Sequence, residues 1–227
     1  MLIALLPMKG NSERVPQKNI RPLNGKPLFF YVADNIKKTG LFDNLVINTD
    51  SSEIEKMAME RYGGWLKIIK RPAFLRGDMI SMNRIIEFDV KSIGVDHDYM
   101  QMHSTSPFLN PEIIASAVGV YFEQKKAGTL DSLFSVTAIH ARMYDKDLRP
   151  INHDPRILVR TQDLDVVYEE NSAFYLFSGE SFLAKNHRIG KLGKSFPMAR
   201  NSIECLDIDD MNDWLLAEQI IRTGLVK

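Results

Sequence analysis

The chain has 227 residues, and its 29 Lys and Arg residues balance its 29 Asp and Glu residues, so the formal net charge at pH 7 is zero. This length is enough to bury a sizeable α/β core. The balanced charge argues against a general nucleic-acid-binding protein, which needs a basic excess to neutralise phosphates. No apolar run approaches the length of a membrane span. We therefore expect neither a nucleic acid nor a membrane as a partner.

The N-terminal segment and the cysteine content indicate a compartment. The apolar start of the chain is short, has no basic stretch and ends at Pro7, which predicts a first strand rather than a signal peptide. Cys205 is the only cysteine, so an internal disulfide is impossible. Such cysteine usage is typical of reducing compartments, and we expect a cytoplasmic protein.

Short apolar runs alternate with amphipathic segments along the first part of the chain. The Ser52–Glu55 segment has the form of a capping box and predicts a helix start. Alternation of this kind favours a largely parallel sheet with helices on both faces. The predicted strands cover residues 2–6, 45–49, 66–69, 99–102 and 133–139, and the predicted helices cover 28–38, 52–62, 81–93 and 111–126.

The alternation breaks between His140 and Glu170, where the chain is polar and has no clear period. A structureless segment of this length is uncommon inside a compact domain unless it is functional. Beyond it we predict strands at 173–177 and 202–206 and a last helix from 210 to 223. The prediction is one domain over residues 1–227, with an excursion at residues 140–170.

The loop after the first strand has the composition of a polyanion site. A following helix and backbone N–H groups can bind phosphate oxygens together with the cations of such a loop. For any single cation, a solvated basic loop is the simpler interpretation, but the ordered set favours a phosphate site. The loop contains Lys9, Gly10, Asn11, Ser12, Arg14 and Lys18.

This segment resembles the N-terminal loop of the sugar-acid cytidylyltransferases, which make CMP-activated sialic acids and their relatives. In that family an Ala/Pro-Xaa-Arg/Lys loop leads into Pro-Xaa-Lys-Asn and then Gly-Lys-Pro-Leu. Here Met8-Lys9, Pro16-Gln17-Lys18-Asn19 and Gly25-Lys26-Pro27-Leu28 take those places. The resemblance runs in consistent order from residue 2 to about 220. It implies a three-layer α/β nucleotidyltransferase (Rossmann-like) fold, with a mostly parallel mixed sheet and an extended dimerisation excursion.

Asp207-Ile208-Asp209 is the second informative motif. In a strand, residues two apart point to the same side, so the two carboxylates would face together. Mg²⁺ takes one or two carboxylates plus substrate phosphates. Taken alone, the motif is more often an acidic cap of the last helix, a role that suits Asp210. The similarity to the family's Asp-Ile-Asp, followed by a helix with Leu-Ala-Glu, favours a Mg²⁺ site on Asp207 and Asp209.

The segment from His103 to Phe108 lies between a predicted strand and a predicted helix, where ligands bind in open α/β sheets. The family has Gln-Pro-Thr-Ser-Pro here, and this chain has His103-Ser104 in place of Gln-Pro. A plain Ser/Thr turn into the next helix is a fair alternative. Asn171-Ser172-Ala173 resembles the family's Asn-Gly-Ala, which borders the sugar pocket.

The family usually has Arg-Pro just before that last motif, whereas this chain has Glu169-Glu170. Because like charges repel, these carboxylates cannot hold a substrate carboxylate. The substrate would need another cation, and Arg142 and Arg160 are the nearest candidates in sequence. Alternatively, Glu169 and Glu170 point to solvent or pair with these arginines.

The resemblance implies transfer of CMP from CTP to a 2-keto sugar acid with release of pyrophosphate, in a homodimer joined by the excursion. It implies Lys18, Asp209 and Lys9 as catalytic residues, with Lys18 stabilising charge in the transition state. The implied nucleotide-binding residues are Met8, Lys9, Gly10, Asn11, Ser12, Arg14, Lys18, Asn19, Arg71, Asp78 and Ser81. The implied sugar-binding residues are His103, Ser104, Thr105, Ser106, Arg142, Arg160, Glu170, Asn171 and Ser172.

Two other functions remain open from the sequence. One is a nucleotide-sugar-dependent glycosyltransferase, which also places an Asp-Xaa-Asp near Mg²⁺ but usually in the middle of the chain. The other is a non-enzymatic nucleotide-binding homologue. The sugar acid itself is not identified, and the candidates are sialic-type nonulosonates, including legionaminic and pseudaminic acids, or an octulosonate.

Overall fold

The computed structural model describes residues 1–224 and contains a seven-stranded sheet in the order β5-β4-β1-β6-β8-β7-β9. Within it, only β8 runs antiparallel to its neighbours. A separate hairpin joins β2 (Pro22–Leu23) to β3 (Lys26–Pro27). The strands of the large sheet are β1 (Leu2–Leu5), β4 (Asn44–Thr49), β5 (Leu66–Lys70), β6 (Asp98–Met102), β7 (Ser132–Ile139), β8 (Val167–Ser178) and β9 (Gly193–Ala199).

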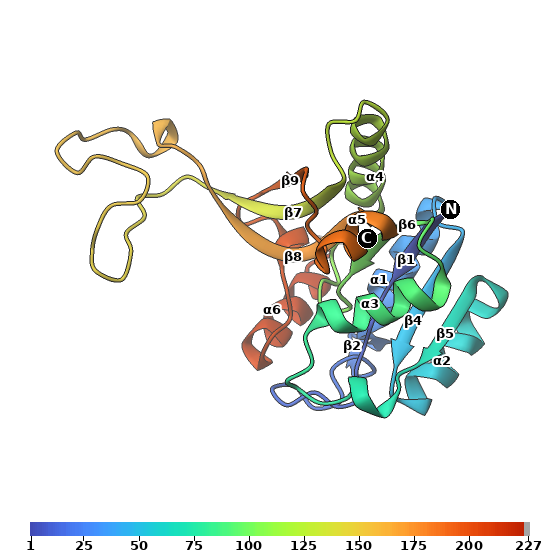
Figure 1. Ribbon diagram of the computed structural model, residues 1–227. Helices are drawn as coiled ribbons and strands as arrows, with labels where there is room; N and C mark the ends of the chain where they lie inside the picture. Colours follow the sequence, from blue (N-terminus) through green and yellow to red (C-terminus); the bar gives the residue numbers. More distant parts are fainter. Residues whose placement is uncertain (225–227) are drawn as a thin grey trace.

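Helices cover both faces of this sheet (Figure 1). Apolar residues of α1, α2 and α4 pack on one face, and those of α3 and α5 pack on the other. Helix α6 packs against the loop after β1 in a third cluster that contains Val15, Phe108 and Trp214. The helices are α1 (Leu28–Thr39), α2 (Ser52–Tyr62), α3 (Met82–Ile93), α4 (Pro111–Lys126), α5 (Gly179–Lys185) and α6 (Met211–Arg222). The predicted three-layer α/β fold with a mostly parallel mixed sheet is confirmed.

Local chemistry explains most of these elements. All four residues of β1 are buried, as expected of a parallel strand covered on both faces. Helix α4 starts with the Asn110 side chain accepting a hydrogen bond from the Ile113 amide, and Pro111 occupies its first turn. Helix α6 has a full capping box between Asp210 and Asp213. Within residues 1–224, no helix has the length and apolarity needed to cross a membrane.

Three local predictions were wrong. The cap of α2 is Ser51, whose Oγ accepts from the Ile54 amide, and Ser52 is already inside the helix. The strand predicted at residues 202–206 is a 3₁₀ turn at Ile203–Cys205. Helix α5 and strand β9 were missed. Strand β9 contains Pro197, which a central strand does not tolerate but an edge strand does.

The excursion is shorter than predicted, because β8 begins at Val167 and its first residues pair with the end of β7. Residues 140–166, here called the arm, leave the sheet and extend away from it as a long loop (Figure 1). Its hydrogen bonds within the described chain join arm residues to each other, as in the Asn152 amide that binds the Ala141 and Asp165 carbonyls.

Candidate active site

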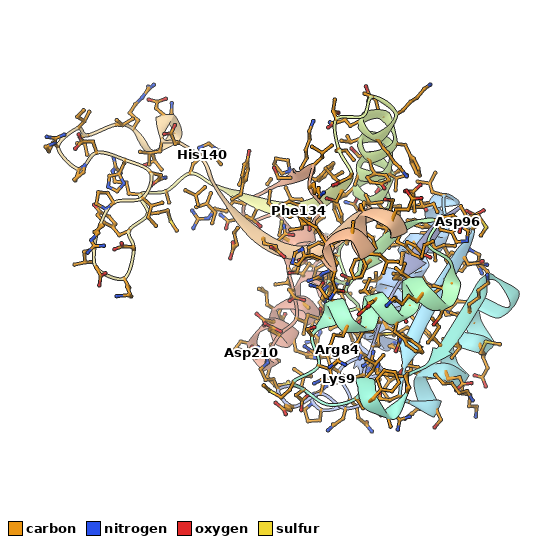
Figure 2. All side chains as sticks on the ribbon, viewed as in Figure 1. Lys9, Arg84, Asp96, Phe134, His140 and Asp210 are labelled. Atoms are coloured by element: carbon orange, nitrogen blue, oxygen red, sulfur yellow. The ribbon has the colours of Figure 1, made fainter. Side chains whose placement is uncertain are left out.

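A cleft of about 430 Å³ lies at the carboxyl ends of the parallel strands β1, β5 and β6, the edge at which open α/β sheets bind ligands. Figure 2 shows Lys9, Arg84 and Asp210 near this edge and Asp96 at the opposite one. Of the predicted site residues, those that line the cleft are Met8, Lys9, Ser12, Arg14, Lys18, Asn19, Arg71, Asp78, His103, Ser104, Thr105, Ser172, Asp207 and Asp209.

The loop after β1 is fixed by its neighbour β4. The Met8 amide donates to the Asn48 carbonyl at 2.9 Å, and the Gly10 amide donates to the Asp50 carboxylate at 2.8 Å. A Cβ on residue 10 would lie 2.8 Å from the Ser51 Cβ, so only glycine fits without displacement. Gly10 is not among the residues that line the cleft, and Asp50 anchors the loop rather than capping α2.

Asn19 joins two sides of the cleft. Its side-chain amide donates to the Lys9 carbonyl at 2.9 Å, and its Oδ1 accepts from the Ser104 hydroxyl at 2.7 Å. Asn19 and Ser104 are both buried. Because buried polar groups require partners, this pair holds the cationic loop against the turn after β6.

Arg71 forms part of the cleft wall and is itself buried. Its Nε and Nη2 donate to the Oδ1 and the carbonyl of Asn48 at 2.8 and 2.9 Å. The Asn48 amide in turn donates to Asp89 on α3. Burial lowers the pKa of Arg71 and raises the pKa of Asp89 to about 7. The sequence did not single out Asp89, because one acidic residue on an amphipathic helix carries no distinguishing signal.

The segment with Asp207 and Asp209 is extended but unpaired, so the predicted strand is absent. The Ile208 amide donates to the Thr105 carbonyl at 2.8 Å, and the Ile208 carbonyl accepts from Lys18 Nζ at 2.6 Å. With Ile208 buried beneath them, the carboxylates on either side both line the cleft.

Opposite charges are close together at this point. Arg14 Nη2 lies 2.9 Å and Lys18 Nζ 3.9 Å from Asp209 Oδ1. Burial lowers the pKa of Lys18, and the charges of Asp209 and Asp207 oppose that change. Burial also raises the pKa of Asp207, which the neighbouring Asp209 raises further. Across the cleft, Lys9 pairs with Asp78.

The carboxylates suit a magnesium ion that is shared with a substrate. Within residues 1–224, Asp207 Oδ1 is buried without a hydrogen-bond partner. In the same residues, no group of three or more His, Cys, Asp or Glu side chains could hold a metal by itself. Mg²⁺ normally takes one or two carboxylates and completes its shell with water and substrate phosphates. Asp207 and Asp209 therefore fit Mg²⁺ better than a metal held by protein ligands alone.

A bulge in β8 forms the far side of the cleft. The register with β7 shifts so that Phe134 faces Tyr175 while Val136 faces Glu170. Ser172 has a φ of 58° and lines the cleft, whereas Asn171 binds the Thr137 hydroxyl at 3.2 Å. The Asn-Ser-Ala motif is therefore the bulge that turns a hydroxyl toward the site.

His103 lies next to this bulge. Burial, with a smaller contribution from the charge of Arg188, lowers the pKa of His103 to about 4, so its imidazole is neutral at pH 7. Within the described chain its Nε2 is buried without a partner. Ser106 does not line the cleft; its amide donates to the His103 carbonyl at 3.3 Å and closes the turn.

The model of the cytidylyltransferase family matches residues 3–219. The chain belongs to this family. It is 24% identical to a pseudaminic acid cytidylyltransferase of Campylobacter jejuni, over 98% of this chain and 97% of the relative. It is 28% identical to a CMP-N,N'-diacetyllegionaminic acid synthase of Legionella pneumophila, over 97% and 96% of the two chains. A solved CMP:2-keto-3-deoxy-manno-octonic acid synthetase complexed with CTP has a TM-score of 0.68 at 13% identity, over 98% and 99%.

The family predicted from the N-terminal loop is thus confirmed.

Several predicted site residues of this cytidylyltransferase lie outside the cleft. Arg142 binds the Val159 carbonyl and Arg160 binds Asp163, both within the arm, whose base is marked by His140 in Figure 2. The two arginines therefore do not reach the cleft of their own chain.

Glu169 and Glu170 are adjacent in β8, so their side chains point to opposite faces of the sheet. Glu170 accepts a hydrogen bond from the Tyr175 hydroxyl, whereas Glu169 lines a different pocket together with Arg200. Both residues are exposed, as the solvent alternative predicted, whereas the arm arginines bind the Val159 carbonyl and Asp163 instead. Three further predicted residues, Asn11, Ser81 and Asn171, are not among those that line the cleft.

The cleft also has an apolar wall that sequence reasoning missed. It consists of Pro7, Gly77, Ile80, Met82 and Ile85. Ile80 and Met82 flank Ser81. The sequence predicted Ser81 as the contact residue of this segment, whereas its two apolar neighbours line the cleft. Apolar side chains at the start of a helix are most simply read as core, and only the fold shows that these border a cleft.

Proposed function

We propose that this cytidylyltransferase transfers CMP from CTP to a 2-keto sugar acid of the nonulosonate type and releases pyrophosphate. The observation that carries the proposal is the cleft itself. Its lining combines cations from the β1 loop and Arg71 with the Asp207–Asp209 pair, two cations of the loop lying within 4 Å of Asp209. The two curated relatives above are named for pseudaminic and diacetyllegionaminic acids, which supports a nonulosonate over an octulosonate.

In the reaction, the anomeric hydroxyl of the sugar acid attacks the α-phosphorus of CTP. A bond from that oxygen to phosphorus forms, the bond to the pyrophosphate oxygen breaks, and one proton is released. Such a transfer needs positioning and charge neutralisation more than covalent help. Lys9 and Arg14 are half-exposed and suit the triphosphate, whereas Lys18 is 12% exposed and held in place by the Ile208 carbonyl.

Asp207 and Asp209 would hold Mg²⁺, and the unpartnered Asp207 Oδ1 supports this assignment. A bound Mg²⁺ supplies Lewis acidity and positive charge at phosphate oxygens. Arg14 and Lys18 lie near Asp209, so the same carboxylate would keep both cations close to phosphates bound at this point. The neutral imidazole of His103 and the hydroxyl of Ser172 line the same cleft, which supports a role for them in binding uncharged groups of the sugar.

A pyrophosphate-release assay tests the activity. Each of the four nucleoside triphosphates is incubated with Mg²⁺ and a panel of pseudaminic, legionaminic, N-acetylneuraminic and octulosonic acids. We expect release with CTP and at least one nonulosonate, and loss of release with EDTA. Release from no combination would overturn the proposal, and CTP binding without turnover would favour a non-enzymatic homologue.

We further propose that the arm joins two copies of the chain into a homodimer. Large apolar side chains of the arm are exposed, among them Leu148 at 80% and Leu158 at 91%. The arm projects away from the sheet, so a second copy of the chain can be contacted without moving the cleft (Figure 1). In such a dimer, Arg142 and Arg160 would approach the partner's cleft rather than their own. Deletion of residues 145–160 should abolish the dimer, and full activity of a monomeric deletion variant would contradict a role in the site.

A further inference from the structure

Arg188 is a half-buried cation that the reaction outlined above does not use. It follows α5 and lies over the ring of Tyr175, with its guanidinium carbon 3.8 Å from the ring centroid. Its Nη1 donates to Gln101 Oε1 at 2.7 Å. Gln101 and Tyr175 are cross-strand partners in β6 and β8. The hydrogen bond and the ring contact that hold the guanidinium therefore both come from the sheet.

One edge of this guanidinium is unused. Within residues 1–224, its Nε is buried without a hydrogen-bond partner, and Arg188 forms no ion pair with a carboxylate. Nη1 is occupied by Gln101, so the edge left over is Nε with Nη2. That edge presents two parallel N–H groups, the geometry that pairs with a carboxylate in a bidentate manner. Stacking on an aromatic ring uses the face of the guanidinium and leaves the N–H groups of this edge without a partner in the described chain.

Arg188 does not itself line the cleft, but the residues that hold it adjoin His103 and Ser172, which do. Gln101 is the second-last residue of β6, and His103 follows directly after the strand. The charge of Arg188 contributes to the lowered pKa of His103, which lines the cleft. The Tyr175 hydroxyl lies 3.0 Å from the hydroxyl of Ser172, which also lines the cleft. Two buried nitrogens without partners, on Arg188 and His103, therefore lie in one polar region.

We propose that Arg188 is the cation that binds the carboxylate of the sugar acid, through its free Nε–Nη2 edge. The inference rests on the proposed function for the identity of the ligand, and on the structure for the site. It assigns the contact to a residue on the chain's own β8–α5 side rather than to the arm arginines. It also accounts for Glu169-Glu170, since Glu170 is bound to Tyr175 and does not occupy the free edge of the guanidinium.

The test compares the best acid of the pyrophosphate-release panel with its C1 amide, in wild type and in Arg188→Gln. Wild type should prefer the acid by about 10- to 100-fold in kcat/KM, because a charge-assisted bidentate pair is lost with the amide. Arg188→Gln should reduce that preference to a few-fold by raising KM for the acid, while KM for CTP and the melting temperature stay nearly constant. Arg188→Lys should recover only part of the preference.

Two control variants separate binding from structure. Lys191→Gln removes an exposed charge from the same loop and should keep the full preference for the acid. Glu170→Gln removes the nearby carboxylate and should keep or increase it. Loss of the preference in Glu170→Gln to the same degree as in Arg188→Gln would mean that Arg188 serves only to balance Glu170, and would overturn the proposal.

Failure of this inference is distinguishable from failure of the proposed function. Turnover of an acid with an unchanged acid preference in Arg188→Gln overturns the role of Arg188 and leaves the function intact. If no acid is turned over, saturation-transfer NMR with the same four acids decides. Signals in wild type that vanish in Arg188→Gln support the subsite, and equal signals, or none in wild type, overturn it.

Discussion

The cleft and the arm differ in how far along the chain their contacts reach. In the cleft, hydrogen bonds join residues 85 and 190 positions apart, between Ser104 and Asn19 and between Lys18 and Ile208. In the arm, the longest side-chain hydrogen bond of the described residues spans 17 positions, between Arg142 and the Val159 carbonyl. The cleft is therefore held by the whole fold, whereas the arm is held by local turns.

This difference has an energetic consequence. Ordering each residue of a loop costs about 1–2 kcal/mol of conformational entropy, which the cleft residues offset through the buried core beneath them. The arm instead leaves Leu148 and Leu158 exposed. In the proposed dimer these side chains would contact the second copy of the chain, so the two regions should respond differently to mutation. The following predictions separate them.

The acidic pair should give the largest effect. We expect Asp209→Asn to reduce turnover by ~10²–10³ or more, as for loss of a central electrostatic group. The melting temperature should hardly change, because the Asp209 side chain is 52% exposed. Asp96→Asn, at the opposite edge of the sheet and 80% exposed, is the matched control. Near-normal turnover in folded Asp209→Asn would falsify the metal assignment.

A buried and an exposed cation of the same loop should differ. Lys18→Ala is expected to slow the single-turnover rate by about 10- to 100-fold and to weaken CTP binding less, because its charge matters most as pyrophosphate leaves. Arg14→Ala, at a side chain 63% exposed, should have a smaller effect on the rate. Calorimetric titration of CTP with single-turnover kinetics measures both. A pure loss of CTP affinity in Lys18→Ala would make it a binding residue only.

The arm should affect association and leave the fold unchanged. Leu148→Asp combined with Leu158→Asp is expected to weaken the dimer by about tenfold or more, since each buried leucine contributes about 1.5–3 kcal/mol. Sedimentation at micromolar concentration measures this, and Met59→Asp on α2, at 47% exposure, serves as control. Wild type that sediments only as a monomer would contradict the proposed dimer, as would an unchanged dimer in the double variant.

The smallest effect is expected behind the cleft, at Asp89. Burial raises the pKa of this carboxyl to about 7, so the folded state takes up a proton below that pH while the unfolded state remains ionised. Stability should then rise as pH falls. Between pH 7.5 and 6, the free energy of unfolding of wild type should gain about 1 kcal/mol relative to Asp89→Asn.

Urea unfolding of both proteins at the two pH values measures this difference. Histidines that titrate in the unfolded state do so in both proteins and cancel. A gap between wild type and Asp89→Asn that stays constant with pH would show that Asp89 is already ionised in the folded protein. The support of Arg71 through Asn48 would then be an ion-pair network rather than a neutral one.

The sequence alone determined the layered α/β fold, because apolar period and cap residues act locally. It also predicted most of the cleft, since the segments that begin at Lys9 and His103 follow β1 and β6, whose carboxyl ends meet at one edge, and since Asp207–Asp209 was predicted from its motif although it follows a 3₁₀ turn. The helix start at Asp210 was predicted from its role as an acidic cap, and the structure adds the capping box with Asp213.

Only the tertiary structure decided which side chains meet across the sheet. Glu169 and Glu170 lie on opposite faces of β8 by ordinary alternation, and the bulge at Asn171–Ala173 then shifts the register of the following residues, so that Tyr175 lies beneath Arg188. Arg188, Asp89 and Ile80 carried no local signal, because their environment comes from residues distant in sequence. A period-two pattern predicts which side chains of a strand share a face of the sheet, but a register shift can move them to the other face. The burial and the electrostatic environment of a side chain depend on the assembled fold.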